Sequence, residues 1–197
     1  MENKKGKRIA VMRSSPRKKG NTNWLTDIVV DELRAVGCEV FEFDLFDMEI
    51  KPCTACRWCQ KDWDSVSCIQ KDDMQPIFDA ILKSDVILLA TPIYSWYCTP
   101  PMKAMLDRLV YAMNMYYGDE RGPSIWAGKE VSVITTCGLR PEKGADLFLE
   151  GIRRYCKYSG LVFKNVLCER HMGYKTVFPD EEKRAHAVEF AKEISCC

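Results

Sequence analysis

The chain has 197 residues, 47% of them hydrophobic and 29% charged, which is the balance of a folded globular protein and excludes a disordered one. The formal net charge is +1, so no global field attracts nucleic acid or an anionic membrane surface. No segment approaches the roughly 20 apolar residues that cross a bilayer, and no signal peptide is visible. We therefore expect one cytoplasmic domain over residues 1–197, with neither a nucleic-acid nor a membrane partner.

Four of the eleven cysteines lie close together, between residues 53 and 68. Disulfides are rarely kept in the cytoplasm and the cysteine count is odd, so this crowding indicates a metal or redox role rather than a disulfide framework. Four other cysteines fall in predicted strands or at helix edges, and we expect them to be small core residues: Cys38, Cys98, Cys156 and Cys168.

The first half of the chain alternates between strand and helix patterns. A short apolar run is followed by apolar residues at helical spacing, and a second strand-like run precedes a stretch with neither period. We interpret that stretch, residues 48–72, as a cysteine-rich insertion. The predicted elements are, in order, a strand at 7–12, a helix at 22–36, a strand at 38–43 and, at the end of the insertion, a helix opened by Asp72 and Asp73.

The second half continues this alternation. Residues 85–90, DVILLA, are almost continuously apolar, which is typical of a central parallel strand buried on both faces. Thr99 followed by Pro100 predicts a helix start with the threonine as cap. The remaining predicted elements are a loop at 116–128, a strand at 131–135, a helix at 145–158, a strand at 161–167 and a helix at 180–194.

Five strands alternating with five helices predict an α/β protein whose parallel sheet is covered by helices on both faces. With right-handed crossovers, the doubly wound strand order 2-1-3-4-5 follows. Ligands of such sheets bind beyond the carboxyl ends of the strands, where the strand order reverses. We therefore expect a site at the loops after the first, third and fourth strands.

The loop after the first strand carries hydroxyl groups, basic residues and a glycine, and it leads into a helix N-terminus, whose free amides favour an anion. It has neither the Walker A spacing nor a GxGxxG motif, so a single phosphate fits it better than a nucleoside triphosphate or a Rossmann dinucleotide. The alternative is an ordinary capped helix after a basic turn.

The loops after the third and fourth strands add aromatic rings and a glycine. Rings at the end of a buried strand are costly to expose, and a flat ligand ring that forms hydrogen bonds would cover them. The alternative is that Trp96 and Tyr97 pack under neighbouring loops or at a dimer contact. Gly138 lets backbone amides approach a ligand closely.

Together these loops resemble the flavodoxin-like NAD(P)H-dependent FMN reductases, specifically the branch that includes iron-sulfur flavoproteins. The resemblance spans most of residues 7–138 and rests on SSPR at 14–17, GNT at 20–22, TPIY at 91–94, and PC-x-x-C-x-x-C at 52–59 with DDM at 72–74. Ser14 stands where the family usually has glycine. If that position needs a positive φ, serine would be strained there.

The resemblance implies that FMN binds at the three loops. The phosphate would be held by Ser15, Arg17, Asn21 and Thr22, and the ribityl chain and ring would be bordered by Pro92, Ile93, Tyr94, Ser95 and Trp96 on one side and by Thr136, Cys137 and Gly138 on the other. The sequence contains no GxSxG or HExxH motif, so we expect the flavin, and no catalytic side chain, to carry the chemistry. His171 is a further residue that could approach the flavin.

Cys53, Cys56 and Cys59 form C-x-x-C-x-x-C, and Cys68 follows after eight residues. The resemblance implies a 4Fe-4S cluster on these four cysteines, near a subunit interface and within electron-transfer reach of the flavin. Two alternatives stay open, namely reduced structural thiols and a tetrahedral zinc site. Trp58 and Trp63 either shield a cluster or simply pack.

The sequence therefore predicts an FMN-dependent oxidoreductase. NAD(P)H, or ferredoxin through the cluster, would supply electrons that leave to a small acceptor such as a quinone, free flavin or oxygen. One alternative is a non-enzymatic electron carrier of the flavodoxin type, and another is a zinc-stapled binding module without flavin. The resemblance also implies a homodimer or homotetramer.

Overall fold

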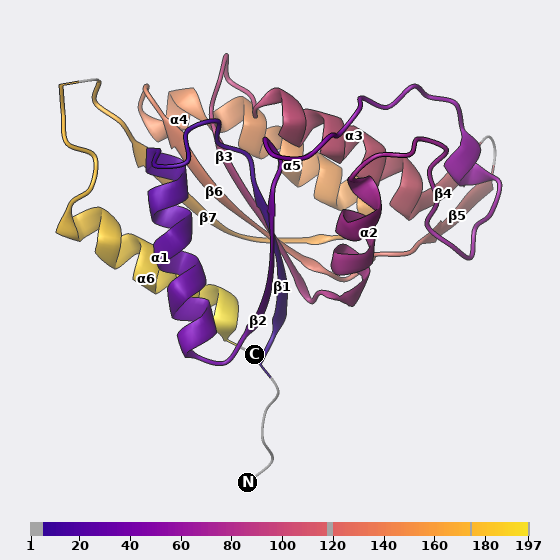
Figure 1. Ribbon diagram of the computed structural model, residues 1–197, viewed down its shortest axis with the longest axis horizontal. Helices are drawn as coiled ribbons and strands as arrows, with labels where there is room; N and C mark the ends of the chain where they lie inside the picture. Colours follow the sequence, from indigo (N-terminus) through magenta and orange to yellow (C-terminus); the bar gives the residue numbers. More distant parts are fainter. Residues whose placement is uncertain (1–5, 118–119, 174, 197) are drawn as a thin grey trace, which may run out of the picture.

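The computed structural model describes residues 6–117, 120–173 and 175–196, and its centre is a parallel sheet (Figure 1). The strands lie in the order β2-β1-β3-β6-β7, and every neighbouring pair is parallel. Counted within this sheet alone, the order is 2-1-3-4-5, which confirms the predicted doubly wound topology. The strands are β1 (Arg8–Arg13), β2 (Glu39–Asp44), β3 (Val86–Pro92), β6 (Glu130–Cys137) and β7 (Val162–Arg170).

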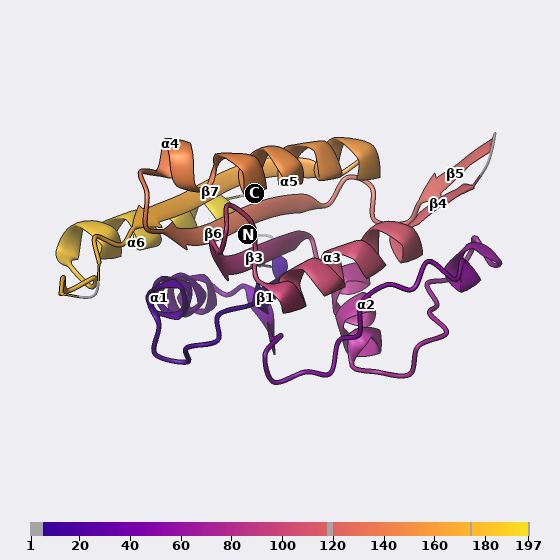
Figure 2. The same ribbon diagram turned by 90° about the horizontal axis from the view of Figure 1, so that it is seen from above.

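Helices cover both faces of the sheet (Figure 2). One face packs against α1 (Asn21–Ala35) and α6 (Glu181–Ser195), and the other against α2 (Met74–Lys83), α3 (Pro100–Met113) and α5 (Asp146–Ser159). A short helix α4 (Pro141–Gly144) follows β6, and a 3-10 turn η1 (Trp58–Gln60) lies in the cysteine-rich insertion.

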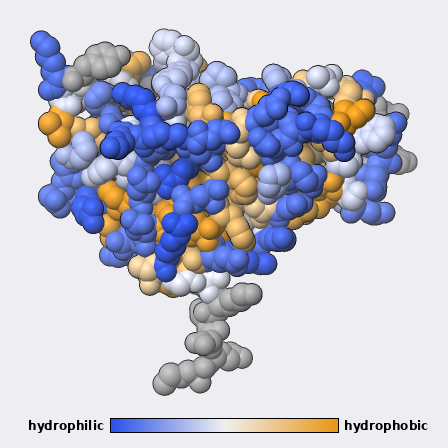
Figure 3. All heavy atoms as spheres, viewed as in Figure 1, coloured by the Kyte–Doolittle hydropathy of each residue, from blue (hydrophilic) through white to orange (hydrophobic). Residues whose placement is uncertain are grey.

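Alternation along the strands divides the core into two layers. In β1, Ile9 and Val11 face α1 and α6, whereas Ala10 and Met12 face α2 and α3, because successive side chains of a strand point to opposite faces. All seven residues of β3 are buried, as expected for a strand covered on both sides. On the surface seen in Figure 1, a hydrophobic band lies between hydrophilic sectors (Figure 3).

The prediction of a loop at 116–128 is wrong in part. The chain forms an antiparallel hairpin of β4 (Asn114–Tyr117) and β5 (Glu120–Ser124), which projects from the end of α3. The hairpin is anchored by the Asn114 amide, whose oxygen accepts bonds from Ser124 Oγ (2.8 Å) and from the buried Trp126 Nε1 (3.0 Å). These anchoring contacts are polar hydrogen bonds, so neither hydrophobic period indicates the hairpin.

Two strands extend further than their apolar runs. β3 continues through Thr91 and Pro92, and β6 through Thr136 and Cys137, and the paired residues Pro92 and Thr136 lie side by side at the sheet edge. Residues expected in loops are therefore partly strand residues held by the backbone ladder. Within the described part of the chain, no helix is long and apolar enough to span a membrane.

Candidate functional site

The loop between β1 and α1 turns tightly at Gly20. The Gly20 amide donates to the Arg17 carbonyl at 2.9 Å, and a side chain at position 20 would bring its Cβ within 2.9 Å of the same oxygen. No side-chain hydrogen bond caps the N-terminus of α1. Its first amides therefore keep their capacity to bind an anion, with Arg17 and Asn21 beside them.

Ser14 is buried and has no positive φ, so the strain considered for serine at this position does not occur. Its hydroxyl lies 2.5 Å from that of Thr99, and Thr99 Oγ1 also donates to the Ser14 carbonyl at 3.0 Å. Thr99 is the N-cap residue of α3 and Pro100 its first residue, as predicted, but the Thr99 hydroxyl makes no capping hydrogen bond and instead joins the β1 loop to the start of that helix.

Ser15 and Thr22 lie behind the surface of this loop, and both are almost fully buried. The Ser15 hydroxyl donates to the Arg17 carbonyl at 3.3 Å, and the Thr22 hydroxyl lies 2.8 Å from that of Thr136 in β6. Their side chains therefore fix the shape of the loop and its distance from the sheet. A ligand would meet the backbone here rather than these hydroxyl groups.

The segment after β3 forms a two-residue turn in an uncommon conformation. Tyr94 and Tyr97 exchange backbone hydrogen bonds of 2.8 and 2.9 Å, and between them Ser95 and Trp96 have φ of 49° and 63°. Such turns favour Asn-Gly, and a left-handed residue other than glycine costs about 1–2 kcal/mol and is typical of functional sites. Trp96 Nε1 donates to the Lys143 carbonyl at 3.0 Å, yet its ring stays about half exposed.

These segments surround a cavity of about 510 Å³ at the carboxyl edge of the sheet, named here the sheet-edge cavity. An adjoining hollow of about 240 Å³, the side cavity, shares Ile93, Cys137 and Gly138 with it and adds Ser95 and Trp96. The fold thus brings together all the predicted flavin residues except Ser15 and Thr22. The sheet-edge cavity is lined by Arg17, Asn21, Pro92, Ile93, Tyr94, Thr136, Cys137, Gly138, His171 and Gly173.

The segment after β7 contributes lining residues that sequence reasoning largely missed. Of these residues, the sequence suggests only His171. The His171 backbone amide donates to the Cys137 carbonyl at 2.9 Å, so the segment after β7 extends past the end of β6. Gly173 follows with φ of 116°, and Leu139 and Gly144 line the side cavity. The pairing of β6 with β7 places His171 and Gly173 there, so no local pattern could have indicated these two, whereas Leu139 and Gly144 directly follow β6 in the chain.

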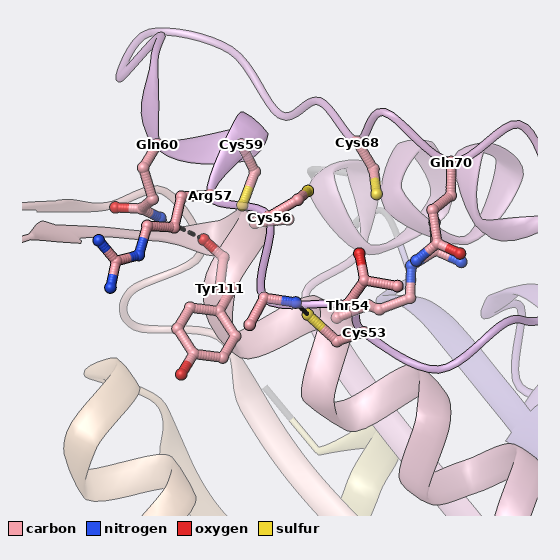
Figure 4. Close-up of a pocket in the computed structure, with 12 residues that line it drawn as sticks. Cys53, Thr54, Cys56, Arg57, Cys59, Gln60, Cys68, Gln70 and Tyr111 are labelled. Atoms are coloured by element: carbon pink, nitrogen blue, oxygen red, sulfur yellow. Dashed lines mark hydrogen bonds between the residues drawn. The ribbon is translucent and has the colours of Figure 1, made fainter.

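The four clustered cysteines line a second cavity, of about 150 Å³, named here the cysteine cavity. Cys53, Cys56, Cys59 and Cys68 direct their sulfur atoms toward one shared space, beside Tyr111 of α3 (Figure 4). A backbone hydrogen bond from Trp58 lowers the pKa of Cys56, and burial raises the pKa of Cys59. Among the described residues, no three His, Cys, Asp or Glu side chains form a group that could hold a metal ion.

The backbone around Cys56 is held in an uncommon form. Ala55 and Arg57 both have left-handed backbones, with φ of 52° and 62°. Gln60 ties the turn to α3 through bonds from its amide to the carbonyls of Tyr111 (2.5 Å) and Asn114 (3.1 Å). The insertion is thus an ordered loop attached to α3 and the hairpin.

Neither tryptophan of the insertion lines the cysteine cavity. Trp63 lies against Gly122 of β5, where an added Cβ would come within 2.8 Å of the ring, and its Nε1 donates to the Gln60 carbonyl at 3.2 Å. Trp58 is exposed, with the Lys61 ammonium 4.3 Å from its ring centroid. Both rings pack on the protein surface rather than shield the cysteines.

Arg108 of α3 also lines the cysteine cavity, and its side chain is only 2% exposed. Its guanidinium forms an ion pair with the fully buried carboxylate of Asp72, and that carboxylate also accepts the Lys51 amide at 3.0 Å. Arg108 Nε and Nη2 are nevertheless buried without a hydrogen-bond partner. Donors left unpaired in this way are rare and call for an acceptor in the cavity.

The fold and the cavity at the carboxyl ends of β1, β3 and β6 define a flavodoxin-like α/β protein. The family can be stated more closely. Residues 7–148 match the NADPH-dependent FMN reductase family, and the chain belongs to that family.

Relatives in sequence include an iron-sulfur flavoprotein from Archaeoglobus fulgidus, 34% identical over 96 residues, which is 49% of this chain and 42% of that protein. An iron-sulfur flavoprotein from Methanosarcina thermophila is 29% identical over 103 residues, 52% of each chain. The chain spans about half the length of the curated relatives it matches.

Solved structures share the fold at low sequence identity. The NAD(P)H:quinone oxidoreductase from Methanothermobacter marburgensis superposes with a TM-score of 0.68 at 16% identity, covering 96% of this chain and 95% of that one. A Streptococcus flavodoxin superposes with a TM-score of 0.57 at 17% identity, covering 95% and 97% of the two chains. At these identities the likeness bears on the fold alone.

Proposed function

We propose that this chain binds FMN in the sheet-edge cavity and acts as an NAD(P)H-dependent oxidoreductase that reduces a small acceptor. The observation that carries the proposal is the convergence of the three predicted loops on one cavity of about 510 Å³, within the usual range of about 300–1,000 Å³ for small-molecule sites. Membership of the NADPH-dependent FMN reductase family supports the same cofactor and the same class of donor.

The residues present fit the phosphate of FMN. The uncapped start of α1 offers backbone amides and the positive end of its dipole, and Arg17 on the cavity lining adds a positive charge. Asn21 adds a side-chain amide at the same end of the cavity. The bonds of Thr22 to Thr136 and of Ser15 to Arg17 would hold these donors in position.

The remaining lining fits a flat ring with a polar edge. Pro92, Ile93 and Tyr94 would border one side and the 136–138 segment the other, with Ser95 and Trp96 at the side cavity. When bound, FMN supplies the hydride and single-electron chemistry, which no side chain of the cavity could perform. The protein's own task is then to orient the ring, restrict water and leave one face open to the donor and the acceptor.

Titration with FMN followed by a nicotinamide assay tests this function. Flavin fluorescence should be quenched on addition of the protein, and the complex should oxidise NADPH or NADH when a quinone, free flavin or oxygen is present. Binding without steady-state oxidation would favour a flavodoxin-like electron carrier, because a carrier needs a partner reductase. A folded protein that binds no flavin would refute the proposal and favour a zinc-stapled binding module.

We further propose that the cysteine cavity holds an iron-sulfur cluster on Cys53, Cys56, Cys59 and Cys68. The four sulfurs line a space of about 150 Å³, whereas tetrahedral zinc with Zn–S bonds of about 2.3 Å would draw its ligand sulfurs to within about 4 Å of one another. Arg108 Nε and Nη2 are unpaired donors that the sulfide and thiolate acceptors of a cluster would satisfy. The names of the relatives support the same assignment.

A cluster would let ferredoxin act as an alternative electron donor. Anaerobic purification followed by iron, sulfide and zinc analysis tests for the cluster separately from the flavin. Iron with equimolar sulfide supports the cluster, whereas zinc, or reduced thiols with neither metal, would refute it and leave the flavin proposal intact.

We also propose a homodimer or homotetramer. Tyr94 and Trp96, each about half exposed, are apolar surface that such an interface would cover. Sedimentation with only monomer at micromolar concentration would refute the oligomer.

A further inference from the structure

Two cysteines outside the insertion lie in contact at the edge of the sheet. Cys137, the last residue of β6, and Cys168 of β7 have their Sγ atoms 4.0 Å apart. Cys168 pairs with Thr135 in the parallel register, two residues before Cys137, and residues two apart share one face of a strand. The two thiols therefore project to the same side of the sheet from neighbouring strands.

Gly144 and Leu139 hold the Cys137 thiol against that of Cys168. Gly144 packs on it so closely that an added Cβ would lie 3.0 Å from the sulfur, and the Leu139 carbonyl lies 3.2 Å away as an acceptor. Cys137 lines both the sheet-edge cavity and the side cavity, although only 4% of the residue is exposed. Cys168, in contrast, lines neither cavity.

The two thiols also differ in acidity. A hydrogen bond from the Cys168 thiol lowers the pKa of Cys137, with the Arg170 guanidinium contributing in the same direction. The pKa of Cys168 is raised, chiefly by this bond to Cys137 and also by burial. Cys98 and Cys156, buried thiols without such a partner, have pKa values raised to about 12 by burial. One thiol of the pair is thus suited to attack and the other to resolve the product.

We propose that Cys137 and Cys168 form a redox-active dithiol that reduces small linear disulfides at the sheet-edge cavity while no flavin occupies it. The Cys137 thiolate attacks one sulfur of the small disulfide, breaks its S–S bond and releases one thiol, which leaves a mixed disulfide on Cys137. The Cys168 thiol loses its proton and attacks the Cys137 sulfur, which expels the second small thiol. The small disulfide gains two electrons and two protons, and the cysteine pair loses the same.

Closure of the pair requires a short movement. The sulfurs must approach from 4.0 Å to the disulfide length of about 2.05 Å, which rotation of both side chains and a small shift of the strand ends can supply. Cys137 pairs with Arg170 and its carbonyl accepts the His171 amide at 2.9 Å, so this shift takes place within the β6–β7 ladder.

Peptide mapping of the purified protein tests the pair directly. The protein is incubated with excess oxidised glutathione, alkylated under denaturing conditions and digested with trypsin, which releases Cys137 in residues 130–143 and Cys168 in residues 165–170. The expected result is a disulfide that joins these two peptides and disappears on addition of dithiothreitol. Linkage of either peptide mainly to another cysteine, or no linkage in folded protein, would overturn the proposal.

Single variants test the order of attack. In Cys168→Ser a glutathione adduct should accumulate on peptide 130–143, because the resolving thiol is missing. In Cys137→Ser peptide 165–170 should stay free of the adduct, because Cys168 faces neither cavity and is a poor nucleophile. An adduct on Cys168 but not on Cys137 would overturn the assignment. Cys156→Ala is the matched control and should retain the cross-link. None of these readouts requires flavin, so they are independent of the proposed function.

Discussion

The hydroxyl groups of Thr22 and Thr136 lie 2.8 Å apart and join the first turn of α1 to the carboxyl end of β6. Both residues are almost fully buried. The bond sets the distance between the loop that would hold the FMN phosphate and the strand end that would border the ring. The binding of a cofactor that touches both segments therefore depends on the Thr22–Thr136 hydrogen bond, which links the two loops.

Removal of this bond should weaken flavin binding. Thr22→Val keeps the shape of the side chain but leaves the Thr136 hydroxyl without its partner, and we expect stability to fall by about 1 kcal/mol and FMN to dissociate faster. Denaturant unfolding and FMN titration check both effects. The control is Thr26→Val, whose hydroxyl bonds only to the Thr22 carbonyl of its own helix. Equal loss of FMN affinity in both variants would contradict the expectation.

Arg17→Ala should discriminate between phosphate and ring binding. The guanidinium lines the sheet-edge cavity beside the uncapped start of α1, so its removal should lower FMN affinity about tenfold, as expected for one charge-assisted contact. Riboflavin, which has no phosphate, should bind both proteins equally. Lys19→Ala is the control, because Lys19 is exposed in the same loop and does not line the cavity. A parallel loss of riboflavin affinity would show that Arg17 contacts another part of the ligand.

Ser95→Gly should stabilise the flavin-free protein. Ser95 has a φ of 49°, which glycine adopts without steric cost, so the free energy of unfolding should rise by about 1 kcal/mol. Thermal or denaturant unfolding measures the change. Lys19→Gly, at a loop position without a positive φ, should not stabilise the protein. A destabilised Ser95→Gly protein would mean that the serine side chain makes a contact worth more than the backbone strain.

Arg108→Met should destabilise the protein severely. It leaves the Asp72 carboxylate buried without its cation, which costs about 3–5 kcal/mol. The double variant Arg108→Met/Asp72→Asn removes the uncompensated charge while keeping an oxygen for the Lys51 amide, so it should recover part of the loss. If Arg108 also donates to a bound cluster, the folded double variant should retain less iron than the wild type. A double variant no more stable than the single one would contradict the buried-charge explanation.

The ion pair of Asp85 with Arg8 should make stability depend on pH in the acid range. Burial by itself would raise the pKa of Asp85, but hydrogen bonds from the Arg8 amide (2.8 Å) and guanidinium (3.2 Å) hold it below its usual range. A carboxyl with a lower pKa in the folded state contributes stability above its unfolded pKa and loses it as the pH falls through the folded pKa. Unfolding curves from about pH 5 to about pH 2 should therefore fall more steeply for the wild type than for Asp85→Asn. Identical slopes would contradict this.

Much of the fold follows from the sequence because its signals are local. The apolar run of β3, the helical spacing in α1 and the glycine after it depend on residues within one element, and the right-handed crossover rule then leaves one strand order. The three loops of the proposed flavin site could also be predicted from the sequence, because in a doubly wound sheet the position of the ligand follows from the topology. Thr99 takes the predicted N-cap position of α3, but its hydroxyl makes no capping bond because it bonds to the buried Ser14 of another loop.

The sequence by itself determined the doubly wound sheet, the loops at its carboxyl edge and the grouping of four cysteines in one insertion, because each depends on spacing along the chain. Only the tertiary structure decided that Cys137 meets Cys168, that Arg108 turns unpaired donors toward the cysteine cavity and that residues after β4 form a hairpin. The cysteine contact and the Arg108–Asp72 pair join residues far apart in the chain, and the hairpin is anchored by the buried Asn114 amide; no periodic pattern encodes the partners of such strand registers and buried polar groups.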